Sequence, residues 1–118
     1  MFRVENIESP RSGRPVANQF TVFFDTAVGR VLLFQSYDTP IAMVVSHRVH
    51  DVLYYIATDK KYSMTTSKYQ NMFYKKYGKS IVRQLTVSNF SEWLEAIHNP
   101  ASFNALLLQE RERKCIEK

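Results

Sequence analysis

The stretch Arg30–Val45, RVLLFQSYDTPIAMVV, decides the fold, because it holds two strand patterns separated by a polar bend and no helix pattern. Its first half is apolar on both faces, which is typical of an interior strand. Its last five residues, IAMVV, are rich in β-branched residues and predict the next strand. Between these halves, Asp38 and Thr39 can cap a turn and Pro40 interrupts strand pairing. The stretch therefore predicts two neighbouring strands joined by a bend.

The segment NQFTVFF, which precedes this pair, also has a strand pattern. Phe20, Val22 and Phe24 fall on one face of an extended chain. Gln19 and Thr21 fall on the other face, which gives the two-residue period of a strand. A turn that ends at a glycine predicts a hairpin between this strand and the next.

The rest of the chain adds further strands and capped helices. The predicted elements are strands at 52–58 and 81–87, a helix at 67–78, a helix after Asn89 and a helix from Pro100. Ser67 with Gln70, and Asn89 with Glu92, have the spacing of a capping box. Consecutive strands without intervening helices favour an α+β fold. We expect an antiparallel sheet of about four to five strands with two to three helices on one side.

The 118 residues correspond to one domain. Residues 1–16 contain two prolines and a glycine without a sustained period, so we expect a loosely ordered N-terminal arm whose apolar side chains can dock on the domain. The α+β domain is expected over 17–109. A polar C-terminal tail that frays is expected over 110–118.

Composition indicates a soluble protein of a reducing compartment. The single cysteine, Cys115, cannot form a disulfide within the chain. The N-terminal residues lack the apolar segment of a secretory signal, and no stretch approaches the roughly 18 apolar residues of a membrane-spanning helix. We therefore expect a cytoplasmic location in the host cell.

Positive charge is concentrated in one part of the sequence. The net charge is +5, and residues 59–83 contain seven lysines or arginines against Asp59 alone, a local balance of +6. A basic surface suits an anionic partner, such as nucleic acid, a nucleoprotein or an acidic protein face, although a solvated helix surface gives the same pattern. The candidate partner-binding residues are Lys60, Lys61, Lys68, Tyr74, Lys75, Lys79 and Arg83. Of these, we expect Lys68, Lys75 and Lys79 to form a row on the helix, with Tyr74 exposed.

The sequence does not support a catalytic, metal or cofactor site. Ser36 lies in a polar stretch but has no histidine near it in sequence to act as a base. The hydroxyls of TTSK can cap a helix or cradle a phosphate, yet the glycine-rich loop of a nucleotide site is missing. His47 and His50 have a spacing that can hold a metal, but no second cluster completes a ligand set. We expect a protein that is not an enzyme and has no cofactor.

Several short motifs carry a resemblance. NQF (18–20), FQSY (34–37), the Ile41–Ala42 pair and YSMTTSKY (62–69) occur here in the same order as in a family of small uncharacterised domains encoded by bacteriophages and related mobile elements. The chain resembles that family over about residues 17–76. The resemblance implies a biological setting rather than an activity. In that setting, small phage proteins often bind and block host machinery, including CRISPR effectors, which suggests a function by analogy.

These observations lead to two functional hypotheses. The first is a non-enzymatic phage or mobile-element accessory protein that binds and inhibits a host protein or nucleoprotein by occlusion, with an anti-CRISPR or other anti-defence role. The second is a protein that binds nucleic acid directly through the basic helix. The two differ in salt dependence, because direct binding to nucleic acid weakens steeply with added salt.

Overall fold

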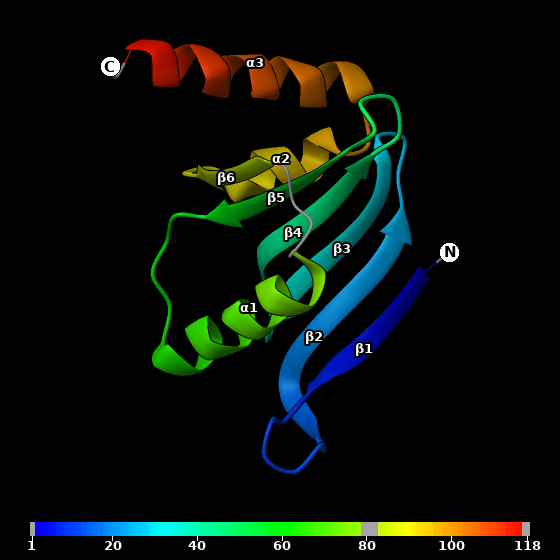
Figure 1. Cartoon of the computed structure of the whole chain (residues 1–118), viewed down its shortest axis with the longest axis vertical. Helices are drawn as coiled ribbons and strands as arrows, with labels where there is room; N and C mark the ends of the chain where they lie inside the picture. Colours follow the sequence, from blue (N-terminus) through cyan, green and yellow to red (C-terminus); the bar gives the residue numbers. More distant parts are fainter. Residues whose placement is uncertain (1, 79–82, 117–118) are drawn as a thin grey trace.

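The computed structural model describes residues 2–78 and 83–116, which form a six-stranded sheet and three helices (Figure 1). The strands are β1 (Phe2–Glu8), β2 (Pro15–Asp25), β3 (Gly29–Ser36), β4 (Thr39–His47), β5 (Val52–Thr58) and β6 (Arg83–Val87). The helices are α1 (Met64–Tyr77), α2 (Phe90–Ala96) and α3 (Pro100–Ile116). Strands follow one another across the sheet in chain order. The predicted α+β class is confirmed.

The sheet is mixed and has more strands than predicted. Strand β1 adds a sixth member by pairing antiparallel with β2. Strands β5 and β6 run parallel, whereas the other neighbouring pairs are antiparallel. The parallel pair arises because α1 carries the chain back along the sheet before β6 begins. The prediction of a wholly antiparallel sheet is therefore wrong at this edge.

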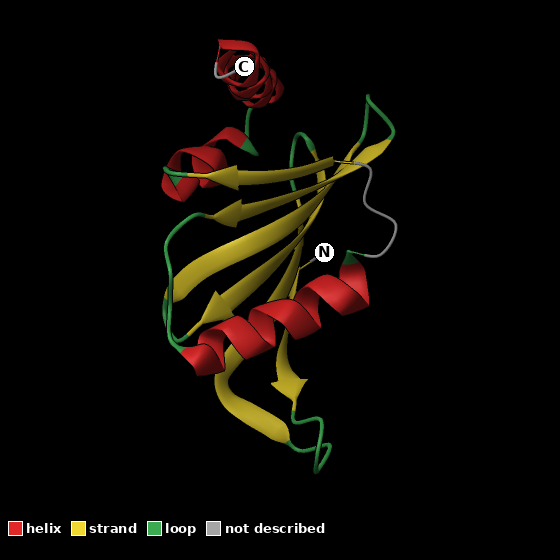
Figure 2. Cartoon of the chain, turned by 60° about the vertical axis from the view of Figure 1, so that its left-hand side comes forward, coloured by secondary structure: helices red, strands yellow, loops and turns green. Residues whose placement is uncertain are grey.

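Helices cover both faces of the sheet, so the prediction that they gather on one side is also wrong. Helix α1 lies on one face, and α2 and α3 lie on the other (Figure 2). The interior strands explain this arrangement because they are apolar on both faces. In β4, Ala42 and Val44 pack towards α1, whereas Met43 and Val45 pack towards α2 and α3. A sheet of this kind needs a helical layer on each side.

Aromatic rings fill the space under α1. Phe73 is 2% exposed, and its ring centroid lies 5.8 Å from that of Phe34 in β3. Tyr69 is also buried, which confirms the predicted inner face of this helix. The helix begins earlier than predicted because Ser63, rather than Ser67, is the N-cap, with its Oγ accepting the Thr66 N–H at 3.2 Å.

The opposite layer is held by α2 and α3. Trp93 of α2 and Phe103 of α3 meet edge to face with ring centroids 5.6 Å apart, and Phe103 is fully buried. Both helices begin where the sequence predicted. The side chain of Asn89 accepts the Glu92 N–H at 3.3 Å, and Pro100 is the first residue of α3.

The predicted bend between β3 and β4 is a tight turn at Tyr37 and Asp38. Ser36 pairs with Thr39, so two residues make the connection. Tyr37 has a φ of 57°, and its N–H donates to the Asn18 carbonyl at 2.6 Å. The turn therefore bonds to β2 as well as joining β3 to β4.

The chain ends have more regular structure than the sequence suggested. Residues 2–8, expected in a loosely ordered arm, form β1 because Phe2 and Val4 alternate with charged residues and the backbone pairs with β2. Helix α3 continues to Ile116, through most of the expected polar tail. Among the described residues, no helix is long and apolar enough to cross a membrane.

Candidate anion-binding surfaces

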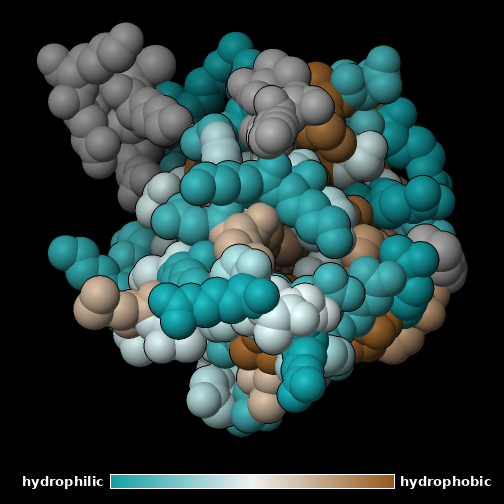
Figure 3. Space-filling model, turned by 60° about the horizontal axis from the view of Figure 1, so that its bottom comes forward, coloured by the Kyte–Doolittle hydropathy of each residue, from teal (hydrophilic) through white to brown (hydrophobic). Residues whose placement is uncertain are grey.

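The two described lysines of the predicted row lie on the solvent side of α1. Tyr69 and Phe73 face the sheet, which leaves Lys68 and Lys75 exposed, two helical turns or about 10 Å apart. In the part of the chain that the structure describes, neither ammonium is paired with a carboxylate. Figure 3 shows the molecule from the end that lies at the bottom of Figure 1, where hydrophilic side chains dominate and hydrophobic ones lie between them. The third lysine, Lys79, lies outside the described residues.

Tyr74 does not have the exposed position that the sequence predicted. Its ring meets Tyr55 of β5 edge to face at a centroid distance of 5.0 Å, and its hydroxyl accepts a hydrogen bond from the Gln84 side chain of β6. The flank of α1 that carries Tyr74 faces the β5–β6 edge, which explains the contact. Tyr74 therefore holds the helix against the sheet. Lys60 and Lys61 lie exposed in the connection before α1.

Arg83 is separated from the lysines by the sheet. It pairs with Tyr54 across β5 and β6, and Tyr54 belongs to the face covered by α2 and α3. The lysines of α1 lie on the other face. The predicted residues thus form two cationic surfaces rather than one: the α1 lysines, and a cleft that contains Arg83.

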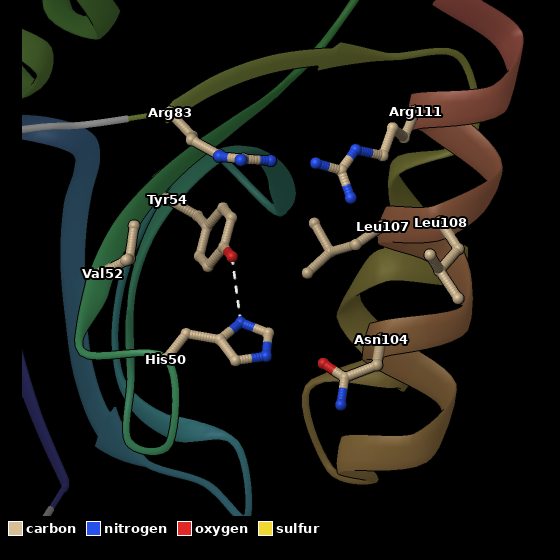
Figure 4. Close-up of a pocket in the computed structure, with 8 residues that line it drawn as sticks. All are labelled: His50, Val52, Tyr54, Arg83, Asn104, Leu107, Leu108 and Arg111. Atoms are coloured by element: carbon tan, nitrogen blue, oxygen red, sulfur yellow. Dashed lines mark hydrogen bonds between the residues drawn. The ribbon is translucent and has the colours of Figure 1, made fainter.

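That cleft opens between the β5–β6 edge and α3 and has a volume of about 460 Å³. Its lining residues are His50, Val52, Tyr54, Arg83, Asn104, Leu107, Leu108 and Arg111. Figure 4 shows the side chains of Arg83 and Arg111 reaching towards one another from opposite walls, with Leu107 between them and the imidazole of His50. We refer to this site as the arginine cleft.

A network of histidines positions one wall of the arginine cleft. The Nδ1 atom of His47 accepts the backbone N–H groups of Val49 and His50, at 3.2 and 3.0 Å. The proton of its ring therefore resides on Nε2, which donates to Asn104 Oδ1 at 3.3 Å. Burial, together with the charge of the adjacent His50, lowers the pKa of His47, although the bond to Asn104 acts in the opposite direction. His47 is thus a neutral ring that anchors α3 to the β4–β5 turn.

His50 extends this network to the surface. Its ring stacks on His47 with centroids 3.6 Å apart, and its Nδ1 lies 3.0 Å from the hydroxyl of Tyr54. His47 Nδ1 accepts two backbone N–H groups of the β4–β5 turn, and the His50 ring stacks on His47. The two histidines therefore stabilise this turn.

The arginine cleft has the chemistry of an anion site. Among the described residues, its lining contains two guanidinium groups and the amide of Asn104, but no carboxylate, serine, threonine or cysteine. The side chains of Arg83 and Arg111 form no hydrogen bond or ion pair with any residue that the structure describes. Guanidinium groups bind carboxylates and phosphates through paired N–H donors. The described lining can bind and orient such a group.

The sequence indicated Arg83 but neither Asn104, which lies within the predicted domain, nor Arg111, which lies in the predicted polar tail over 110–118. A signal was available. Asn104, Leu107, Leu108 and Arg111 have the i, i+3, i+4, i+7 spacing of one helix face.

The hydroxyl-rich motifs form a different, buried cluster. Gln19 Nε2 of β2 donates to Ser36 Oγ at 3.0 Å, and Ser36 Oγ lies 3.1 Å from Thr66 Oγ1. Thr66 is in turn bonded to Ser63, the cap of α1. Gln19, Ser36 and Thr66 are each less than 10% exposed. These bonds join the start of α1 to β2 and β3, which supports a structural role for Ser36 and for Thr66 of the TTSK motif.

Comparison with known families matches residues 3–89, more than half of the chain, to a Family of unknown function (DUF8033). The matched region contains β1 from its second residue, the other five described strands and α1, and it ends at the cap of α2. Comparison with curated proteins and with solved structures gives no match. Of the two arginines in the cleft, Arg83 lies inside the matched region and Arg111 lies beyond it.

Proposed function

The chain belongs to the DUF8033 family of unknown function, and we propose that it is a non-enzymatic accessory protein of a phage or mobile element. In this proposal it binds and inhibits a host protein or nucleoprotein in the host cytoplasm, and anti-CRISPR or other anti-defence activity is the most specific form. The setting is inferred from the ordered motifs at 18–20, 34–37 and 62–69. Their side chains meet in the buried Gln19–Ser36–Thr66 cluster, so the motifs identify one folding unit.

The observation that carries the proposal is a set of cations on α1, β6 and α3 whose side chains have no ion-pair partner among the described residues. Lys68 and Lys75 project from a helix whose other side is fixed by buried rings. Arg83 and Arg111 converge in the arginine cleft, whose described lining contains no carboxylate. Converging like charges repel one another, so an anion between them is stabilised. These cations can cover an acidic patch on a host protein, or the phosphates of a nucleic acid that a host nucleoprotein holds.

Affinity purification tests this proposal. The tagged protein, expressed in host cells, should recover one host protein or nucleoprotein in defined stoichiometry. Arg83→Gln with Arg111→Gln, and separately Lys68→Gln with Lys75→Gln, should reduce recovery if the cations make the contact. Arg11→Gln with Arg14→Gln, which neutralises two exposed arginines between β1 and β2, is the matched control and should recover the partner normally. Recovery that is unchanged in both test variants contradicts the assigned surface.

Direct binding to nucleic acid is the second candidate, favoured by two guanidiniums in one cleft that have no ion-pair partner among the described residues. Binding of this kind should fall steeply between about 50 and 200 mM salt, because each neutralised phosphate releases counterions. The purified protein is titrated with duplex and single-stranded DNA and RNA at several salt concentrations. Failure to retain any of them at low salt eliminates this candidate and leaves the inhibitor proposal standing.

A further inference from the structure

The outer edge of strand β1 is regular, and no strand among the described residues pairs with it. β1 is the first strand in the sheet order, so only one of its edges pairs with β2. Residues Phe2–Asn6 keep an unbroken register with β2, and the register shifts only between Asn6 and Glu8. The regular stretch is therefore centred on Val4. An edge of this kind presents unpaired backbone N–H and C=O groups, and this one contains neither the proline nor the lysine that commonly blocks such edges.

The side chains of β1 make this edge complementary to itself. Arg3 and Glu5 lie on the α1 face, bonded to each other at 3.2 Å, while Phe2 and Val4 lie on the opposite face. Residues directly opposite in an antiparallel pair share a face. A twofold axis that relates two β1 strands must therefore place one residue opposite the same residue of the second copy. An axis midway between two consecutive residues would place side chains of different faces opposite each other.

Charge selects one of the possible axes. An axis at Arg3 places two arginines opposite each other, and an axis at Glu5 places two glutamates opposite each other, which is unfavourable. An axis at Val4 instead places Arg3 of each copy opposite Glu5 of the other. The favourable axis thus coincides with the centre of the regular stretch Phe2–Asn6.

We infer that β1 pairs antiparallel with β1 of a second copy of this chain about a twofold axis at Val4, which joins two six-stranded sheets into one. On the apolar face, the two Val4 side chains meet and each Phe2 lies opposite Asn6. Phe2 and Val4 are 73% and 49% exposed in the single chain, so both gain cover. Each chain has an apolar groove lined by Phe2, Val4, Phe20, Val22, Phe24, Leu33 and Gln35. The pairing joins the grooves of the two copies into one.

Mass measurements test this inference independently of any host partner. Five paired residues make a small interface, so the dimer should depend on concentration. Analytical ultracentrifugation of the wild-type chain should show its mass rising from monomer towards dimer. Glu5→Arg places arginine opposite arginine and should raise the dissociation constant about tenfold or more, equivalent to ~1.4 kcal/mol. The exchange Arg3→Glu with Glu5→Arg restores opposite charges and should restore the dimer.

Matched variants separate this interface from a general effect of charge. Glu8→Arg makes the same charge change on β1, but beyond the register shift. Its dissociation constant should stay within about twofold of the wild-type value, well below the tenfold change expected for Glu5→Arg. Thermal unfolding of each variant shows whether the chain remains folded. In a Cys115→Ser background, Val4→Cys should form an intermolecular disulfide on oxidation, whereas Glu5→Cys should not.

A wild-type chain that stays monomeric up to millimolar concentration overturns the inference. So does a dimer that Glu5→Arg leaves intact, or that the charge exchange fails to restore, because either result places the contact elsewhere on the molecule.

Discussion

The two halves of the sheet differ in how their faces are covered. On the face that carries α2 and α3, the side chains of β4, β5 and β6 are buried under helices, whereas those of β1 and β2 line an open apolar groove. On the other face, Gln19 and Thr21 of β2 are 2% and 4% exposed. Their apolar neighbours in the same strand, Phe20 and Val22, are only half-buried. Hydrophobic alternation therefore identifies a strand without identifying which face is inside.

The covered half should be far more sensitive to loss of side-chain volume. Phe103 is fully buried, with ring centroids of Trp93 and Tyr54 at 5.6 and 5.8 Å. Phe103→Ala should lower the free energy of unfolding by ~3–5 kcal/mol through the cavity that it leaves. Urea denaturation followed by Trp fluorescence measures this change.

Phe2→Ala is the matched change in the open half. At concentrations where the chain is monomeric, its cost should stay below about 1 kcal/mol, because little area is lost from a side chain that is 73% exposed. Similar losses for the two phenylalanines would show that the open face is covered in the isolated chain.

Two glycines provide a backbone version of the same comparison. Gly29 ends the β2–β3 turn, and a Cβ added there would lie 1.9 Å from the Ser46 carbonyl oxygen. Gly29→Ala should destabilise the chain by about 3 kcal/mol, since backbone rather than a flexible side chain must move. Gly13, between β1 and β2, has a φ of 69° and nothing within 4 Å of the added atom.

Gly13→Ala should therefore cost only the left-handed backbone penalty, about 1–2 kcal/mol. Thermal unfolding of both variants is the measurement. Equal losses contradict the close approach at Gly29.

The strand and helix patterns could be predicted because they are local. Capping at Asn89, the start of α3 at Pro100 and the turn at Tyr37 and Asp38 each depend on a few neighbouring residues. The parallel pairing of β6 could not be predicted in this way, since it depends on how α1 crosses the sheet. Strands that are apolar on both faces indicate two helical layers, but the local pattern does not show which helix covers which face.

The candidate site was only partly predictable for the same reason. Arg83 and the α1 lysines belong to one basic stretch of sequence, yet the sheet separates them in space. Arg111 joins Arg83 through tertiary packing of α3 against β5, a contact between residues far apart in the chain. A basic run therefore indicates composition, and the fold decides which cations share a surface.

The buried polar cluster allows the two faces of the β2–β3 pair to be compared. Ser36→Ala removes the partner of Gln19 Nε2, and Gln19 Oε1 is already buried without a hydrogen bond among the described residues. The variant should lower the free energy of unfolding by about 1–2 kcal/mol, because a buried amide is left unpaired.

Gln35→Ala, next in sequence but half-buried on the opposite face, should cost less. Denaturant unfolding of both variants measures the difference. If Ser36→Ala is neutral, water satisfies the amide and the cluster contributes little.

The smallest effect that we expect is a loss of stability on acidification, localised to the covered half. The pKa of His47 is lowered in the folded chain, mainly by burial, so the fold favours the neutral ring. His47 therefore contributes its full stabilisation above the ordinary histidine pKa of about 6.5, and that contribution is lost as the pH falls through the folded pKa. Protonation would also place a hydrogen on Nδ1, which faces the N–H groups of Val49 and His50. Between pH 7.5 and 5.5, the melting temperature of His47→Gln should drop by less than that of the wild-type chain. His98→Gln changes an exposed ring and is the control, which should behave as the wild-type chain does. An identical pH profile for all three chains means that the His47 ring is free to accept the proton, and that the β4–β5 turn is not held by this side chain.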